Sequence, residues 1–151
     1  MKKVILILIF FIINAKLFAQ TIKINVINEL NFGEIVQTEG SDISKTSSSA
    51  AKYTVVSDKK RHVYIDLLLP TNFTNGAYTV PVTFDATRTG WSMTNNPATS
   101  TSFDPHQQLH VQVTQNNAPI YIWLGGTLNT TSMTEPGPYT GTITVKVTLN
   151  P

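Results

Sequence analysis

Residues 139–149 read Tyr-Thr-Gly-Thr-Ile-Thr-Val-Lys-Val-Thr-Leu, and this stretch decides the fold class. Its large apolar side chains fall on one parity, and its threonines and one lysine fall on the other. Successive side chains of a β-strand point to opposite faces, so the pattern predicts a strand with one face on a core and one in water. The core-facing positions that we expect are Ile143, Val145, Val147 and Leu149.

The same two-residue period returns along the chain, for example at residues 21–27, 62–69 and 107–114. Threonine favours strands because its β-carbon is branched, and it occurs 22 times between residues 20 and 151. Helix-forming residues never assemble into a long amphipathic run. We therefore expect an all-β, two-sheet sandwich of seven to nine mostly antiparallel strands, built as a single domain over residues 20–151.

Residues 1–19 have the composition of a secretory signal peptide. A Met-Lys-Lys start is followed by an apolar run over residues 4–13 and by Ala19 before a polar residue. The run is shorter than the ~20 residues that a membrane-spanning helix needs, so we expect no stable membrane span after cleavage. The sequence thus predicts export to the periplasm, the cell surface or the medium.

Charge and cysteine content exclude several classes of protein. Cleavage after Ala19 would remove three of the 11 basic residues and leave eight against nine acidic ones. A nucleic-acid binder needs a clustered basic surplus, which argues against a nucleic-acid partner. The chain has no cysteine, which excludes a thiol nucleophile, a cysteine-based zinc site and a lipid-modified cysteine.

No motif with a catalytic mechanism stands out, so we expect no enzyme, no cofactor and no metal. The best metal candidates are Asp104, His106 and His110. In an extended strand, however, residues 106 and 110 would lie about 13 Å apart, which is too far for one ion. The Gly-x-Ser-x-Gly pattern of a hydrolase is absent from the sequence, so a secreted hydrolase with an unrecognised site is only a weak alternative.

Aromatic residues offer a different kind of site. Trp91 lies in an irregular stretch over residues 90–104 and could stack on a sugar or another ligand. Tyr121 and Trp123 share one face of a predicted strand, and the sequence leaves open whether that face is the core. Packing is the commoner role of large aromatics in a sandwich.

Several local patterns together resemble a known family. They are Leu-Asn-Phe-Gly-Glu-Ile at residues 30–35, Trp-Leu-Gly-Gly-Thr-Leu at 123–128 and Gly-Pro-Tyr-Thr-Gly-Thr at 137–142. This order is similar to that of a family of secreted bacterial proteins, domain-of-unknown-function family 4402, which in turn resembles spore-coat-protein-U and pilin-like domains. The resemblance implies an immunoglobulin-like (pilin-like) sandwich, export and a surface or fimbrial role.

Pilin-like subunits assemble when an extended segment of one subunit completes the sheet of another. Residues 21–27 are extended, near a terminus and apolar at every second position, which makes Ile22, Ile24 and Val26 candidate donor residues. The strand carrying Ile143 to Leu149 would belong to the receiving sheet. The sequence favours the ordinary role of residues 21–27, a first strand paired within its own domain, because the edges of a monomer are usually covered.

The sequence therefore favours an exported, non-enzymatic structural or adhesive surface protein, and a fimbrial-like subunit that assembles by strand addition is one form that such a protein takes. Its partners would be copies of itself or related surface subunits. The alternative is a secreted carbohydrate- or ligand-binding sandwich that uses Trp91.

Overall fold

The computed structural model describes residues 21–33, 40–130 and 135–149. Within these residues the chain forms twelve β-strands and one short 3-10 helix, which confirms the all-β prediction. The predicted signal peptide, residues 1–19, lies outside the described part.

The strands outnumber the predicted seven to nine because several are fragments of two to four residues. Seven strands have five residues or more. In chain order the elements are β1 (Ile22–Asn28), β2 (Ser41–Ile43), β3 (Ala51–Ser57), β4 (Arg61–Leu68), β5 (Asn72–Asn75), β6 (Tyr78–Thr83), β7 (Thr89–Ser92), η1 (Pro97–Thr99), β8 (Thr101–Ser102), β9 (Leu109–Val113), β10 (Pro119–Leu124), β11 (Gly126–Leu128) and β12 (Thr144–Leu149).

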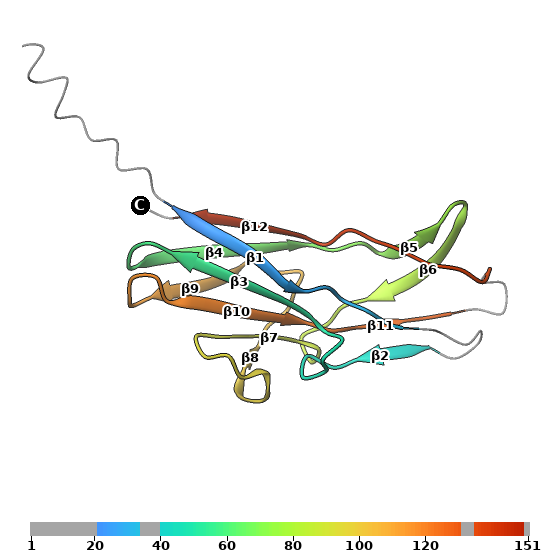
Figure 1. Ribbon diagram of the computed structural model, residues 1–151, viewed down its shortest axis with the longest axis horizontal. Helices are drawn as coiled ribbons and strands as arrows, with labels where there is room; N and C mark the ends of the chain where they lie inside the picture. The colour runs from blue at the N-terminus through green and yellow to red at the C-terminus, as the bar shows by residue number, and fades with distance from the viewer. Residues whose placement is uncertain (1–20, 34–39, 131–134, 150–151) are drawn as a thin grey trace, which may run out of the picture.

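The strands form three antiparallel sheets rather than two. One sheet has the order β1-β3-β10-β7-β8, a second has β12-β4-β9 and a third has β2-β11-β6-β5. Figure 1 shows an elongated molecule, with the third sheet at the end away from the turn between β3 and β4. The first two sheets make the two layers of the sandwich.

The core lies between the inward faces of these layers. Its centre comes from alternate residues of β3, β4, β9 and β10, all buried: Tyr53, Val55, Val63, Ile65, Leu109, Val111, Val113, Ile120, Ile122 and Leu124. Burial of one such aliphatic side chain contributes about 1.5–3 kcal/mol. This alternation, which the sequence displays, is what holds the two layers together.

Gly125 separates the first sheet from the third. β10 ends one residue before it and β11 begins one residue after it, while the Gly125 amide donates to the Arg88 carbonyl over 2.8 Å. A β-carbon at Gly125 would lie 1.9 Å from the Ile43 carbonyl oxygen. Only glycine lets the backbone next to β2 approach this closely, so the chain can turn from one sheet into the next.

An ion-pair cluster joins β2 to the turn after β6. Arg88 donates to the carboxylates of Asp42 and Asp85. The hydrogen bond from Arg88 lowers the pKa of Asp42, and the hydrogen bond from the Thr87 hydroxyl is the main cause of the lowered pKa of Asp85. These carboxylates are partly exposed, so the cluster contributes only modestly to stability.

We expect Gly125→Ala to lower the free energy of unfolding by about 3 kcal/mol, because the new methyl group would overlap backbone that cannot move away. Gly126→Ala is the matched control, since its β-carbon would lie 3.1 Å from the Thr83 carbonyl oxygen. Its expected loss is about 1 kcal/mol. Urea denaturation of both variants tests this, and equal losses would contradict the role given to Gly125.

We expect Arg88→Ala to lower the free energy of unfolding at pH 7 by less than about 1 kcal/mol. A carboxyl group whose pKa is lowered on folding adds stability above its unfolded value, about 3.9, and loses that contribution as pH falls through the folded value. The difference between wild type and variant should therefore shrink below pH 4. Urea titrations across the acid range measure it, and a difference independent of pH would contradict the ion pairing.

Candidate functional site

β1 directs an apolar row toward the interior of the sandwich. In its antiparallel register with β3, Ile24 lies opposite Val55 and Val26 lies opposite Tyr53. Residues directly opposite one another in such a pair point to the same face. Val55 and Tyr53 are core residues, so Ile24 and Val26 face inward as well.

These inward-facing side chains are nevertheless exposed. Ile24 is 42% exposed and Val26 is 60% exposed, whereas their partner Val55 is fully buried. The reason is the extent of the opposite layer. β12 is the edge of that layer and pairs only with β4, and β1 pairs only with β3. Among the described strands none bridges these two edges, so the sandwich is open between them.

We use the word seam for this opening, bounded by β1 on one side and by residues 139–149 on the other. Val145, Val147 and Leu149 lie opposite the core residues Leu67, Ile65 and Val63. The three β12 residues are only partly buried and pack at the margin of the core. Ile143 lies one residue before β12 and has the same partly buried environment.

The predicted donor residues thus belong to the wall of the seam. A single chain pairs β1 with its own β3, as an ordinary first strand would. The donor role of Ile22, Ile24 and Val26 stays a prediction, because it concerns a contact between subunits.

The seam widens into two adjoining cavities near the third sheet. The larger has a volume of about 670 Å³ and lies between residues 30–33 and 135–139. The smaller, about 410 Å³, reaches Val26 and residues 139–143. Leu30, Phe73 and Tyr139 line both, so together the cavities form one groove.

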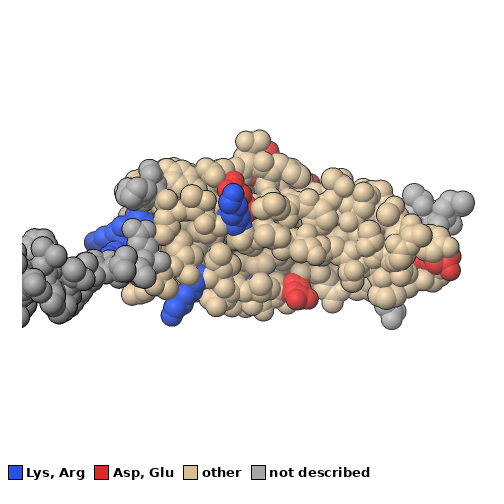
Figure 2. Space-filling model, turned by 90° about the horizontal axis from the view of Figure 1, so that it is seen from above, with Lys and Arg blue, Asp and Glu red and all other residues tan. Residues whose placement is uncertain are grey.

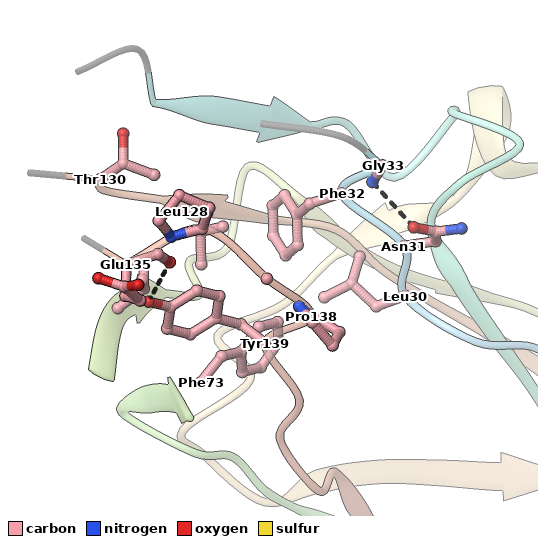
Figure 3. Close-up of a pocket in the computed structure, with 13 residues that line it drawn as sticks. Leu30, Asn31, Phe32, Gly33, Phe73, Leu128, Thr130, Glu135, Pro138 and Tyr139 are labelled. Atoms are coloured by element: carbon pink, nitrogen blue, oxygen red, sulfur yellow. Dashed lines mark hydrogen bonds between the residues drawn. The ribbon is translucent and has the colours of Figure 1, made fainter. Parts of the chain in front are cut away.

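Aromatic and aliphatic side chains line this groove. Figure 3 shows Leu30 and Phe32 pointing into the larger cavity toward Pro138 and Tyr139. The rings of Phe32 and Phe73 meet edge to face at 5.9 Å, and the Tyr139 hydroxyl donates to the Glu135 carbonyl over 2.7 Å. The resulting surface is mostly apolar with a few fixed polar groups, as ligand and peptide sites commonly are.

Close backbone approaches hold the groove in shape. A β-carbon at Gly141 would lie 2.3 Å from the Phe73 ring, so glycine lets residues 139–143 cross this ring. Thr74 and Thr140 exchange two backbone hydrogen bonds of 2.9 and 3.0 Å. On the opposite wall of the groove, the backbone N–H of Asn31 donates to the Ser49 carbonyl over 3.0 Å.

Charge plays a small part at this site. Glu29 and Glu135 are the charged residues that line the two cavities. Burial raises the pKa of the Tyr53 hydroxyl, and the charge of Glu29 adds to the effect. Figure 2, which views the molecule from above, shows charged side chains that are few and scattered. Recognition in the groove would therefore depend on shape and apolar contact.

The metal candidates do not meet. His106 lies before β9, where a ring nitrogen contacts the Phe84 carbonyl oxygen at 3.1 Å. His110 lies on β9 and faces His62 of β4, with the His62 Nδ1 and His110 Nε2 atoms 2.7 Å apart. Within residues 21–33, 40–130 and 135–149, no three histidine or acidic side chains gather into a metal site. Sequence reasoning missed His62, because 48 residues separate it from His110 and only the register brings them together.

Trp91 lies inward. It is opposite the buried Ile122 and packs against the core, so its ring contributes to packing, and a ligand-binding role for it stays a prediction. Tyr121 faces outward and stacks on Trp123 at 5.8 Å, with the Lys52 ammonium group 5.5 Å from the Tyr121 ring. The core face of β10 is the one with Ile120, Ile122 and Leu124, which the sequence left open.

A family model described as "Domain of unknown function (DUF4402)" matches residues 38–149. No curated protein matches the chain. In the described part of the chain, no helix is long and apolar enough to cross a membrane.

The open seam predicts unequal effects of the same substitution on two inward-facing valines. Val26→Thr should change the free energy of unfolding by less than about 0.5 kcal/mol, because Val26 is already in contact with water. Val55→Thr should cost about 1–3 kcal/mol, because it buries a hydroxyl without a partner. Denaturant unfolding at low protein concentration measures both, and equal costs would show that the seam is closed.

Proposed function

We propose that this chain, which belongs to the DUF4402 family of domains of unknown function, is an exported, non-enzymatic structural or adhesive surface protein. In this proposal, subunits assemble like those of a fimbria, by adding a β-strand of one subunit to the seam of another. The partners would be other copies of the chain or related surface subunits.

The observation that carries the proposal is the exposure of Ile24 and Val26 on the core-facing side of β1. Both side chains lie on the face of β1 that points toward the core, yet no described strand of the opposite layer covers them. Apolar surface left in water is unfavourable by about 25 cal/mol per Å². A strand inserted between β1 and β12 would bury both of these residues, together with the half-buried inward row of β12.

Both edges of the seam also offer backbone groups. An edge strand presents a row of unpaired N–H and C=O groups that can template pairing with another chain. An added strand could bond to β1, to β12 or to both, while its alternate side chains enter the groove lined by Leu30, Phe73 and Tyr139. Main-chain bonding would supply affinity, and the groove would supply specificity.

The predicted donor is the segment of residues 21–27. Its side chains Ile22, Ile24 and Val26 would fill the apolar pockets of the receiving subunit. In a single chain this segment makes five register pairs with β3. To act as a donor it would have to leave its own β3 and enter the seam of a partner. The seam, in contrast, can receive a strand without any rearrangement of β1.

Export rests on the predicted signal peptide over residues 1–19. A role without chemistry rests on the sequence, which shows no catalytic motif and no cysteine. The protein would then act through its interfaces in the periplasm or at the cell surface.

A second candidate function is a secreted carbohydrate- or ligand-binding module. The cavity of about 670 Å³ favours it, because this volume lies in the range of small-molecule sites. Since Trp91 packs inward, such a ligand would contact Phe32, Phe73 and Tyr139 instead.

The assembly test compares two apolar residues of similar exposure. Leu68 is 54% exposed on the outward face of β4, and Val26 is 60% exposed in the seam. We expect wild type and Leu68→Asp to form ladders on an unheated denaturing gel, and Val26→Asp to stay monomeric because a carboxylate would have to be buried in the seam. Deletion of residues 21–27 should also abolish the ladders.

Circular dichroism must show that each variant folds. A wild-type chain that stays monomeric at high concentration would refute assembly by strand addition. Ladders of equal strength from Val26→Asp and Leu68→Asp would place the contact outside the seam.

A further inference from the structure

The geometry points to a copper(II) site formed by His62 and His110 on the outward face of the β12-β4-β9 sheet. The two rings come from neighbouring strands, and their facing nitrogens, His62 Nδ1 and His110 Nε2, lie 2.7 Å apart. This site is independent of the seam, because the faces of β4 and β9 that carry the two histidines point away from the core.

Outward orientation follows from the register. Val63 lies opposite Val111, and both are buried in the core. Residues one position away on each strand, His62 and His110, therefore point to the other side of the sheet. There, water and a dissolved ion can reach both rings.

The pair is held on a rigid part of the fold. His62 pairs with Gln112 of β9, and its neighbour Val63 pairs with both β9 and β12, so the backbone at His62 is anchored next to the middle strand of the sheet. The His110 ring stacks on Tyr64 with centroids 4.7 Å apart and planes 7° apart. Ligands fixed in advance in this way lose little freedom when a metal binds.

The separation of the nitrogens favours one class of metal. Two neighbouring ligands in a square-planar complex, at about 2.0 Å from the metal and 90° apart, are about 2.8 Å from each other. Tetrahedral zinc would place them about 3.3 Å apart. The observed 2.7 Å is a hydrogen-bond length, so both rings must turn their lone pairs toward a shared ion, and the square-planar spacing requires the smaller change. Copper(II) is also the divalent ion that nitrogen ligands bind most tightly.

Without metal, the same contact is a hydrogen bond in which one ring nitrogen donates and the other accepts. Copper needs the lone pairs of both facing nitrogens. The proton of the donating ring must then move through solvent to the other nitrogen of that ring, so a neutral pair releases no net proton. Two water molecules would complete the square plane, because no third histidine or acidic ligand lies at the pair in the described residues.

The experiment is a copper(II) titration of the full chain, purified without a polyhistidine tag. We expect one tight site per chain in calorimetry. His62→Ala and His110→Ala should each weaken copper binding at least about 10-fold. Removal of a group that only supports a metal ligand already costs about that much, so removal of a ligand should cost no less. The remaining histidine of the chain supplies the control, since His106→Ala should bind copper like the wild type.

Two further measurements separate the site from copper bound elsewhere. The double variant His62→Ala/His110→Ala should lose the tight site while it keeps the wild-type melting temperature. Sub-stoichiometric copper should broaden the imidazole NMR signals of His62 and His110 before those of His106. No tight binding in the wild type, or binding that the double variant retains, would overturn the assignment.

Discussion

The pairing of β3 with two neighbours sets the conditions for everything else. Val55 lies opposite Ile120 of β10 on one side and opposite Ile24 of β1 on the other. All three side chains face the same way, yet Ile120 is fully buried and Ile24 is 42% exposed. Both pairs are antiparallel and put their side chains on the same face, so the difference in exposure comes from the opposite layer, which covers β10 and stops short of β1. The seam is therefore a consequence of sheet order rather than of local sequence.

This distinction explains how much the sequence could predict. Alternation is a local property, so the class of fold and the inward parity of β12 and β4 follow from the residues alone. The predicted last strand was too long, since β12 begins at Thr144 and residues 139–143 serve as the wall of the groove. Before β12 the chain pairs with a different strand, because Thr140 forms an isolated bridge with Thr74 of β5, and the ladder with β4 starts only at Thr144.

The features that escaped prediction all depend on register between distant strands. His62 and His110 meet only because β4 and β9 are neighbours. A single sequence shows the parity of each strand but not which strand lies beside it. The same limit applies to β1. Alternation in the sequence predicts its apolar row, but it does not predict that the opposite layer leaves this row exposed.

The position of the two edge strands has a mechanical consequence. Ile22, at the start of β1, lies beside Ser57, and Leu149, at the end of β12, lies beside Val63. Both positions flank the turn between β3 and β4, so the outer ends of the edge strands leave the molecule at the same pole (Figure 1). Tension applied through these ends would peel β1 and β12 away one hydrogen bond at a time, instead of shearing whole ladders at once. A strand lodged between the two edges would lie directly in the path of that peeling and would bind the pole together under load.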